Sequence, residues 1–218
     1  MSTMLGEISA KELHGPWFDF MDKLQGNESA LWFAAFKRFL RKENPWDGAT
    51  KKERITFTVT GLGLTGTEWI TRLEYNGHEL SSWANNIITK PDYDQNHRLE
   101  AGKEYKVTLV FGKEIKKDKD RSTANLKAIA IRELGEQAVT DLKGELALLI
   151  RERFSNLELE AMGVGYIAVL HEPIIDSGGG VDVLNSGRNG NKSLVNADDG
   201  GRPSRLWNYI GAFAFFET

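Results

Sequence analysis

The segment formed by residues 178–216 most constrains what this chain can fold into. It begins with a run of Gly, Asn, Ser, Asp and Arg, and residues 181–206 include no aromatic side chain. Small polar side chains bury little apolar surface and favour turns, so this stretch alone predicts a loop. It is followed by Trp207 and by an apolar run at 210–216 that belongs in a sheet. We therefore expect a long polar loop that is held at both ends, a common location for binding sites.

Composition excludes several classes of protein. The chain has 218 residues, 40% of them hydrophobic, which is enough for one large or two small globular domains. Its formal charge of -3 argues against a nucleic-acid partner, because a phosphate-binding surface needs clustered Lys and Arg. The absence of cysteine excludes disulfides, thiolate metal sites and a cysteine nucleophile. With no signal peptide and no apolar run of membrane-spanning length, we expect a cytoplasmic protein without a membrane segment.

Residues 1–100 predict a mostly helical domain with one short strand. Ser29, or Asn27, can cap a helix with aromatic residues at helical spacing, and the aromatic residues at 17–20 are expected to pack on it. Residues 55–60 alternate apolar side chains with threonine, as in a half-buried strand. Thr65 and Glu68 form a capping box for a helix, and a second short helix follows around Trp83.

Gly61, Gly63 and Gly66 match the G-x-G-x-x-G pattern of dinucleotide-binding turns. In such turns, backbone amides at a helix N-terminus contact a pyrophosphate. Here the preceding strand alternates with threonine, whereas a parallel strand covered on both faces is apolar throughout. The helix is also followed by another helix, and not by a second strand. We favour a structural turn and keep a nucleotide-dependent enzyme as the alternative.

Residues 101–218 predict a second domain. A strand at 105–111 is followed by a helix that Ser122 or Thr123 caps, and by a second helix with Leu142 and Leu146 on one face. Ser155 and Glu158 form another capping box, and residues 166–170 predict a buried central strand. The order is strand, helix, helix, strand, long polar loop, strand, which indicates an α+β fold.

These elements carry a family resemblance. The segment at 156–163, the His-Glu-Pro-Ile sequence at 171–174 and the turn at Asp176 resemble variable proteins of diversity-generating retroelements, in particular those of archaea and candidate-phylum bacteria. Stretches at 36–46, 65–73 and 83–93 are similar to proteins of the same group. The spaced anchors that extend the resemblance are Leu184, Arg188, Leu194, Pro203, Trp207, Gly211 and Phe213.

The resemblance implies a C-type lectin-like domain over residues 101–218, whose last strands frame a surface of variable residues. In these systems a reverse transcriptase copies a template with errors at adenines, so that an Asn codon becomes Ser, Asp, Gly, Thr, Val, Tyr or Arg. The implied function is non-enzymatic binding of a variable macromolecular ligand, with protein as the expected class. The residues expected to contact it are Asn185, Ser186, Asn189, Asn191, Ser193, Val195, Asn196, Asp198, Asp199, Ser204, Arg205, Asn208 and Tyr209. Relatives carry aromatic residues where this chain has Ser193 and Val195, which predicts weak affinity unless Tyr209, Trp207 or Arg205 is exposed.

Enzymatic interpretations find little support in the sequence. The four histidines, His14, His78, His97 and His171, lie far apart and outside any H-E-x-x-H pattern, and G-x-S-x-G and Walker sequences are absent. Asp176, Asp182, Asp198 and Asp199 could bind calcium but lack the spacing of a calcium loop. We expect no catalytic residue, no cofactor and no metal. A fixed-sequence interaction protein remains a further alternative.

Overall fold

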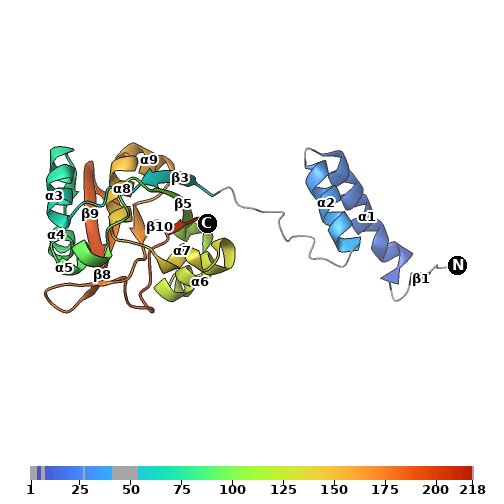
Figure 1. Ribbon diagram of the computed structural model, residues 1–218. Helices are drawn as coiled ribbons and strands as arrows, with labels where there is room; N and C mark the ends of the chain where they lie inside the picture. Colours follow the sequence, from blue (N-terminus) through green and yellow to red (C-terminus); the bar gives the residue numbers. More distant parts are fainter. Residues whose placement is uncertain (1–3, 6–7, 27, 41–53, 218) are drawn as a thin grey trace. The chain divides into compact units, whose positions relative to one another are not determined.

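The computed structural model describes residues 4–5, 8–26, 28–40 and 54–217 (Figure 1). Contacts divide the chain into two compact units, Met1–Glu53 and Arg54–Thr218. The division lies well before residue 101, where the sequence indicated a boundary. The reason is that residues 56–60 pair along their whole length with a strand at 104–111, so the two segments belong to one sheet.

The first unit contains a short antiparallel pair, β1 (Met4–Leu5) and β2 (Ile8–Ser9), and two helices, α1 (Ala10–Gln25) and α2 (Ser29–Leu40). Helix α2 was predicted, whereas α1 was not, because Pro16 within it is a typical helix breaker. Asn27, the alternative cap, lies outside the described residues. Phe20 packs on Phe36 with 4.8 Å between ring centroids, as expected, whereas Trp17 and Phe18 are exposed.

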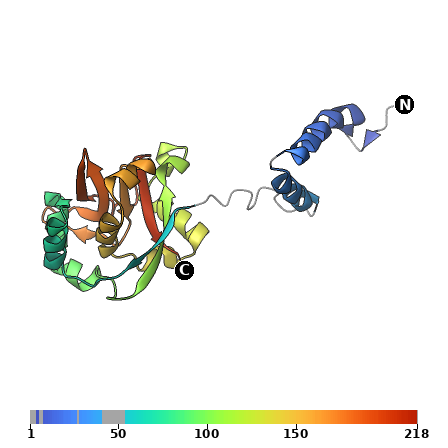
Figure 2. The ribbon, with the colours of Figure 1, turned by 90° about the horizontal axis from the view of Figure 1, so that it is seen from above.

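The second unit is built on one mixed sheet in the order β3-β5-β10-β6-β8-β9-β4 (Figures 1 and 2). The strands are β3 (Thr56–Thr60), β4 (Glu79–Leu80), β5 (Glu104–Phe111), β6 (Tyr166–Val169), β8 (Val181–Asn189), β9 (Lys192–Asp198) and β10 (Gly211–Phe216). A short strand, β7 (Ile174–Ile175), also pairs with β8. Strand β10 is antiparallel to β5 and parallel to β6, and each of its residues is buried. The apolar run predicted at 210–216 thus forms a fully buried interior strand of the sheet, at 211–216.

Helices cover this sheet. They are α3 (Gly66–Tyr75), α4 (Ser82–Ile88), α5 (Pro91–Asn96), α6 (Thr123–Leu134), α7 (Gln137–Thr140), α8 (Glu145–Arg153) and α9 (Asn156–Ala161), with 3-10 turns at Gly112–Glu114 and Asp118–Asp120. Figures 1 and 2 show α3, α4 and α5 grouped at the β9 end of the sheet, and α6 and α7 near β10. The predicted capping boxes at Thr65 and Ser155 are both present. None of the described helices combines the length and apolar character needed to cross a bilayer.

The structure corrects the long polar loop that the composition predicted. Residues 181–198 form a β-hairpin, β8 to β9, that turns at Gly190 with a positive φ of 61°. Its inward polar groups have partners that are distant in sequence: Asn185 Nδ2 donates to Asp198 Oδ2 at 2.8 Å, and Ser186 Oγ donates to the Ala147 carbonyl of α8. Only the segment between β9 and β10 stays irregular.

His171 has a structural role, as expected for a histidine at a strand end. It follows β6 and is 1% exposed. Its Nε2 accepts a hydrogen bond from the Leu184 amide at 3.0 Å, and its Nδ1 bonds the Glu172 carbonyl. Nε2 thus holds β8 next to the end of β6, and Nδ1 is satisfied by the neighbouring residue.

Candidate ligand-binding surface

The irregular segment at residues 199–210, here called the tail loop, is held by main-chain hydrogen bonds. Its Arg205 and Pro203 carbonyls each accept a hydrogen bond at 3.0 Å, from the amides of Thr123 and Ala124 at the start of α6. At the β8 end, Gly201 donates to the Val181 carbonyl at 3.0 Å. These contacts do not depend on which side chains the loop carries.

Trp207 anchors the middle of the tail loop. The indole is 4% exposed, and its ring centroid lies 5.5 Å from that of Phe213 in β10. Its Nε1 donates to Thr123 Oγ1 at 2.9 Å, and that hydroxyl donates in turn to the Gly200 carbonyl at 2.9 Å. A Cβ at Gly200 would lie 2.5 Å from the indole, so only glycine fits there.

Arg121 holds the C-terminal part of the tail loop. Its Nε donates to the Trp207 carbonyl at 3.1 Å and its Nη1 to the Ile115 carbonyl at 2.8 Å, while Nη2 pairs with Asp118. The Trp207 amide donates back to the Arg121 carbonyl at 3.0 Å. This buried guanidinium is therefore a structural group, and each of its three nitrogens bonds an acceptor of the protein.

The other side chains of the tail loop point outward. Leu206 is 54% exposed and Tyr209 60% exposed, and Arg202, Ser204 and Asn208 are also exposed. A depression of about 560 Å³ lies beside them, lined by Asp118, Arg121, Tyr166, Asp198 and residues 205–209. The surface thus combines one aromatic ring, one aliphatic side chain and several polar groups over a fixed backbone.

Arg205 crosses the edge of this depression. Its Nη2 lies 3.4 Å from Asp198 Oδ1 and its Nε 3.1 Å from Asp199 Oδ1, and its guanidinium lies 5.7 Å from the centroid of the Trp207 ring. Burial raises the pKa of Asp198, and the charge of Arg205 acts in the opposite direction. Burial likewise raises the pKa of Tyr166 to about 12. The phenol is therefore neutral, and Arg205 already has carboxylate partners.

The structure separates the expected contact residues into three groups. Exposed are Asn189, Asn191, Ser204, Asn208 and Tyr209, and partly buried are Ser193, Asn196, Asp198, Asp199 and Arg205. Asn185, Ser186 and Val195 are buried, which corrects their assignment to the ligand surface. They were misplaced because the hairpin places Ser186, with its cross-strand partner Val195, on the face toward α8, while Asn185 on the opposite face bonds Asp198. Arg202 and Leu206 are exposed but were not among the expected contact residues.

The expected anchors are also divided. Leu184, Trp207, Gly211 and Phe213 are buried, and Leu194 is partly buried. Arg188 and Pro203 are exposed and do not anchor through their side chains: Arg188 lies 3.5 Å from Glu160 at the surface, and Pro203 contributes its carbonyl. Ile210, the first residue of the apolar run expected in the sheet, precedes β10 and is 38% exposed.

No cluster of three or more His, Cys, Asp or Glu side chains in the described part of the chain could hold a metal ion. Burial raises the pKa of Asp182. Repulsion from the nearby negative charges of Asp176, Asp199 and Asp198 raises it further. Asp176 instead closes a turn, since its Oδ1 accepts hydrogen bonds from the Gly178 and Gly180 amides.

The turn at residues 61–66 has a protein partner where the nucleotide interpretation requires a phosphate. Glu145, at the start of α8, is fully buried, and its Oε1 accepts hydrogen bonds from the Leu62 amide at 2.9 Å and the Gly63 amide at 2.8 Å. Its Oε2 accepts one from Leu99. Asp94 Oδ1 accepts the Gly66 amide at 2.8 Å. Amides that a pyrophosphate would need are thus bound by carboxylates of this chain.

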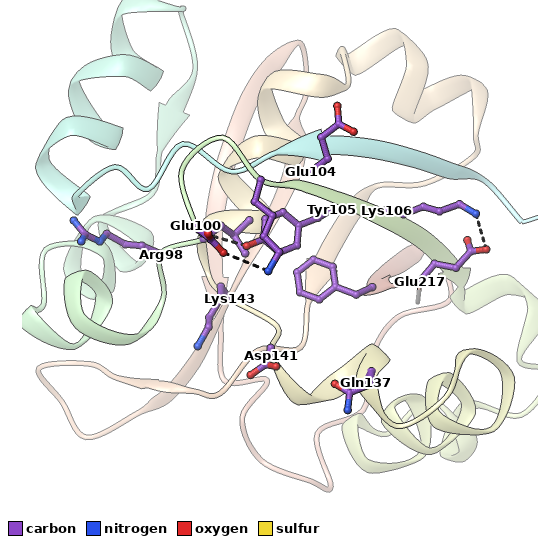
Figure 3. A pocket seen from close by; sticks show the side chains of 12 residues that line it. Arg98, Glu100, Glu104, Tyr105, Lys106, Gln137, Asp141, Lys143 and Glu217 are labelled. Atoms are coloured by element: carbon purple, nitrogen blue, oxygen red, sulfur yellow. Dashed lines mark hydrogen bonds and ion pairs between the residues drawn. The ribbon is translucent and has the colours of Figure 1, made fainter.

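A second depression, of about 450 Å³, lies between β5 and α7 (Figure 3). Figure 3 shows charged side chains of both signs around it, and several of them pair with one another. Lys106 Nζ lies 2.9 Å from Glu217, and Lys103 Nζ lies 3.3 Å from Glu100. This mixed and internally paired lining does not favour a particular class of ligand.

Comparisons of the chain with protein-family models, with curated proteins and with solved structures found no match.

Proposed function

We propose that this protein is a non-enzymatic binding protein whose ligand surface is the tail loop with the adjoining hairpin. The observation that carries the proposal is the separation of roles within the tail loop. Main-chain bonds to α6 and β8, together with Trp207 and Gly200, fix the loop, whereas Arg202, Ser204, Leu206, Asn208 and Tyr209 project from it. Side chains that do not hold the backbone can change without changing the fold.

We further propose that this surface is diversified, as in the variable proteins that the sequence resembles, and that residues 101–218 form the C-type lectin-like part of the unit. Supporting this, the last strands β8, β9 and β10 frame the tail loop, as the resemblance implies. The proposed ligand is a protein, because exposed Leu206 and Tyr209 next to polar side chains resemble the composition of protein interfaces.

The proposal is tested by sequencing the gene across a population, together with its genomic surroundings. We expect a nearby near-copy of the segment that encodes residues 181–216, a reverse-transcriptase gene, and differences at adenines of the copy. Variation should be concentrated at codons 202, 204, 206, 208 and 209 and in the hairpin turn at 189–191. Codons for Gly200, Trp207 and Phe213 should be constant, and codons 104–111 in the same reads give the background rate.

A uniform tail without a second copy would overturn diversification and leave a binding protein of fixed sequence. Variation spread equally over Gly200, Trp207 and the exposed positions would overturn the separation of frame and surface. The structure does not favour a nucleotide-dependent enzyme, because Glu145 and Asp94 already accept the hydrogen bonds of the backbone amides that would bind the phosphates.

A further inference from the structure

The helix pair α1 and α2 leaves a large apolar surface uncovered. Between 38% and 63% of each of six large apolar residues is exposed there, and we call this set the helix-pair surface: Trp17, Phe18, Met21, Phe33, Phe39 and Leu40. Ala35 is the only apolar side chain described in the pair that is fully buried. An exposed apolar surface of this kind marks an interaction site.

The pair makes only a thin core of its own. Phe20 and Phe36 meet between the helices at 4.8 Å, and Lys23 Nζ lies 4.4 Å from the centroid of the Trp32 ring. Two helices share only one interface, so they cannot enclose a core. A folded unit as small as this helix pair usually needs oligomerisation, a metal or disulfides to be stable. Disulfides are excluded because the chain has no cysteine.

The apolar stripe on each helix is wider than one neighbouring helix can cover. On α1, Trp17 and Phe18 lie four and three residues before Met21; on α2, Phe33 and Phe39 lie three residues to either side of Phe36. These spacings place the residues of each helix on one side. Phe36 is covered by α1, and the remainder of the stripe is exposed. Each helix therefore has one part of its stripe that contacts the other helix and a second part that is free to contact another partner. In a four-helix bundle, each helix packs against two others in this way.

Charge and area favour a second copy of this chain as the partner. Residues 10–40 include four acidic residues (Glu12, Asp19, Asp22 and Glu28) and four basic residues (Lys11, Lys23, Lys37 and Arg38). A helix that binds a membrane surface usually has an excess of basic residues, whereas a neutral surface meets no net repulsion from its own copy. At about half exposure, six large side chains of roughly 200 Å² each offer roughly 600 Å² per chain. Specific interfaces bury about 1,200 to 2,000 Å² in total, so roughly 600 Å² from each of two chains reaches the lower end of that range.

We propose that α1 and α2 form a dimerisation module, in which two copies of the chain join their helix-pair surfaces into a four-helix bundle. The inference does not depend on the function proposed for the tail loop.

The test uses the full-length chain. Because the chain has no cysteine, Gln25→Cys introduces a single thiol at an exposed position of α1 for one spin label. Dipolar spectroscopy should then give one defined distance between labels on two chains, and dilution with unlabelled protein should reduce the signal. Sedimentation equilibrium should give twice the 24.5 kDa of one chain.

A double substitution tests the surface itself. Trp17→Gln with Phe33→Gln should weaken the dimer at least 100-fold, measured as the dissociation constant. The matched control is Tyr75→Gln with Leu157→Gln, which changes two side chains of the second unit that are 90% and 78% exposed and should leave the dimer unchanged.

Three results would overturn the proposal. The first is a wild-type chain that stays monomeric at tens of micromolar. The second is a dimer that the Trp17 and Phe33 changes do not weaken, which would place the interface elsewhere. The third is a monomer that binds lipid vesicles and loses this binding in the double variant, which would make a membrane the partner. If the double variant fails to fold, the distance between spin labels in the Gln25→Cys chain still tests whether two copies associate.

Discussion

Single residues of the tail loop divide into those that hold the backbone and those that do not. We expect Trp207→Ala to lower the free energy of unfolding by about 3 to 5 kcal/mol, because it removes a buried indole and its hydrogen bond to Thr123. Ser204→Tyr, three residues earlier on the exposed side, should change it by no more than about 0.5 kcal/mol. Urea denaturation of both variants measures the difference. Equal losses would mean that the exposed side chains also hold the loop.

His171 makes stability dependent on pH. Burial lowers the pKa of His171 to about 3, and the nearby His97 acts in the same direction. In an unfolded chain the pKa of a histidine is about 6.5. Between these values the unfolded chain binds a proton that the folded chain does not. The contribution of His171 is thus complete above about pH 6.5 and is lost progressively as the pH falls toward 3.

His171→Gln should therefore make the loss of stability between about pH 6.5 and pH 4 less steep. The glutamine can still accept the Leu184 amide that His171 binds. Denaturant unfolding over a series of pH values measures the slope. His14→Gln, at an exposed position of α1, is the control and should keep the wild-type slope. Identical slopes for the two variants would contradict a neutral, buried His171.

Among the helices and strands, those with a local sequence signal were predicted. Capping boxes indicated α3 and α9, and alternation indicated β3 and β5. The β8 to β9 hairpin was not predicted, because the polar groups of Asn185 and Ser186 are satisfied by Asp198 and by the Ala147 carbonyl. A sequence shows that such side chains are polar but not that distant partners satisfy them. For the same reason, some buried polar residues were assigned to the expected contact surface. The exposed part of that surface was predicted from the Asn- and Ser-rich composition.

Glu145 links α8 to the turn before α3. Burial raises its pKa, and its hydrogen bonds to the Leu99, Leu62 and Gly63 amides act in the opposite direction. Glu145→Ala leaves these three amides without their acceptor, so we expect a loss of at least about 3 kcal/mol in the free energy of unfolding.

Glu152→Ala is the matched control for Glu145→Ala. Glu152 lies on the same helix and pairs with the partly exposed Arg72 at 2.7 Å. We expect this change to cost less than about 1 kcal/mol. Chemical denaturation of both variants makes the comparison. Similar losses would mean that Glu145 does not hold the turn, and the turn would then merit a test with nucleotides.

For the whole chain, the position of the unit boundary determines which fragments fold. A fragment of residues 54–218 retains the complete sheet and should unfold cooperatively at a temperature close to that of the full chain. A fragment of residues 101–218 lacks β3, α3 and the amides that bind Glu145, and it exposes the edge of β5. It should be aggregated or protease-sensitive. Thermal unfolding and limited proteolysis compare the two fragments, and equal stability would restore the boundary near residue 101.

A dimer formed through α1 and α2 carries two tail loops. Two weak contacts on one particle raise the apparent affinity for a ligand that offers both sites, without any new contact.

The place of β10 in the sheet also determines when the second unit can fold during synthesis. Strand β10 joins β5 on one side to β6 on the other, so without residues 211–216 the sheet remains two separate groups of strands. Its partner β5 lies about a hundred residues earlier, a long-range pairing that forms slowly. A nascent chain therefore cannot complete the sheet until its tail has left the ribosome. A frameshift or stop codon anywhere in the tail loop removes the shared strand, so the truncated chain should have an incomplete sheet and should be sensitive to proteases.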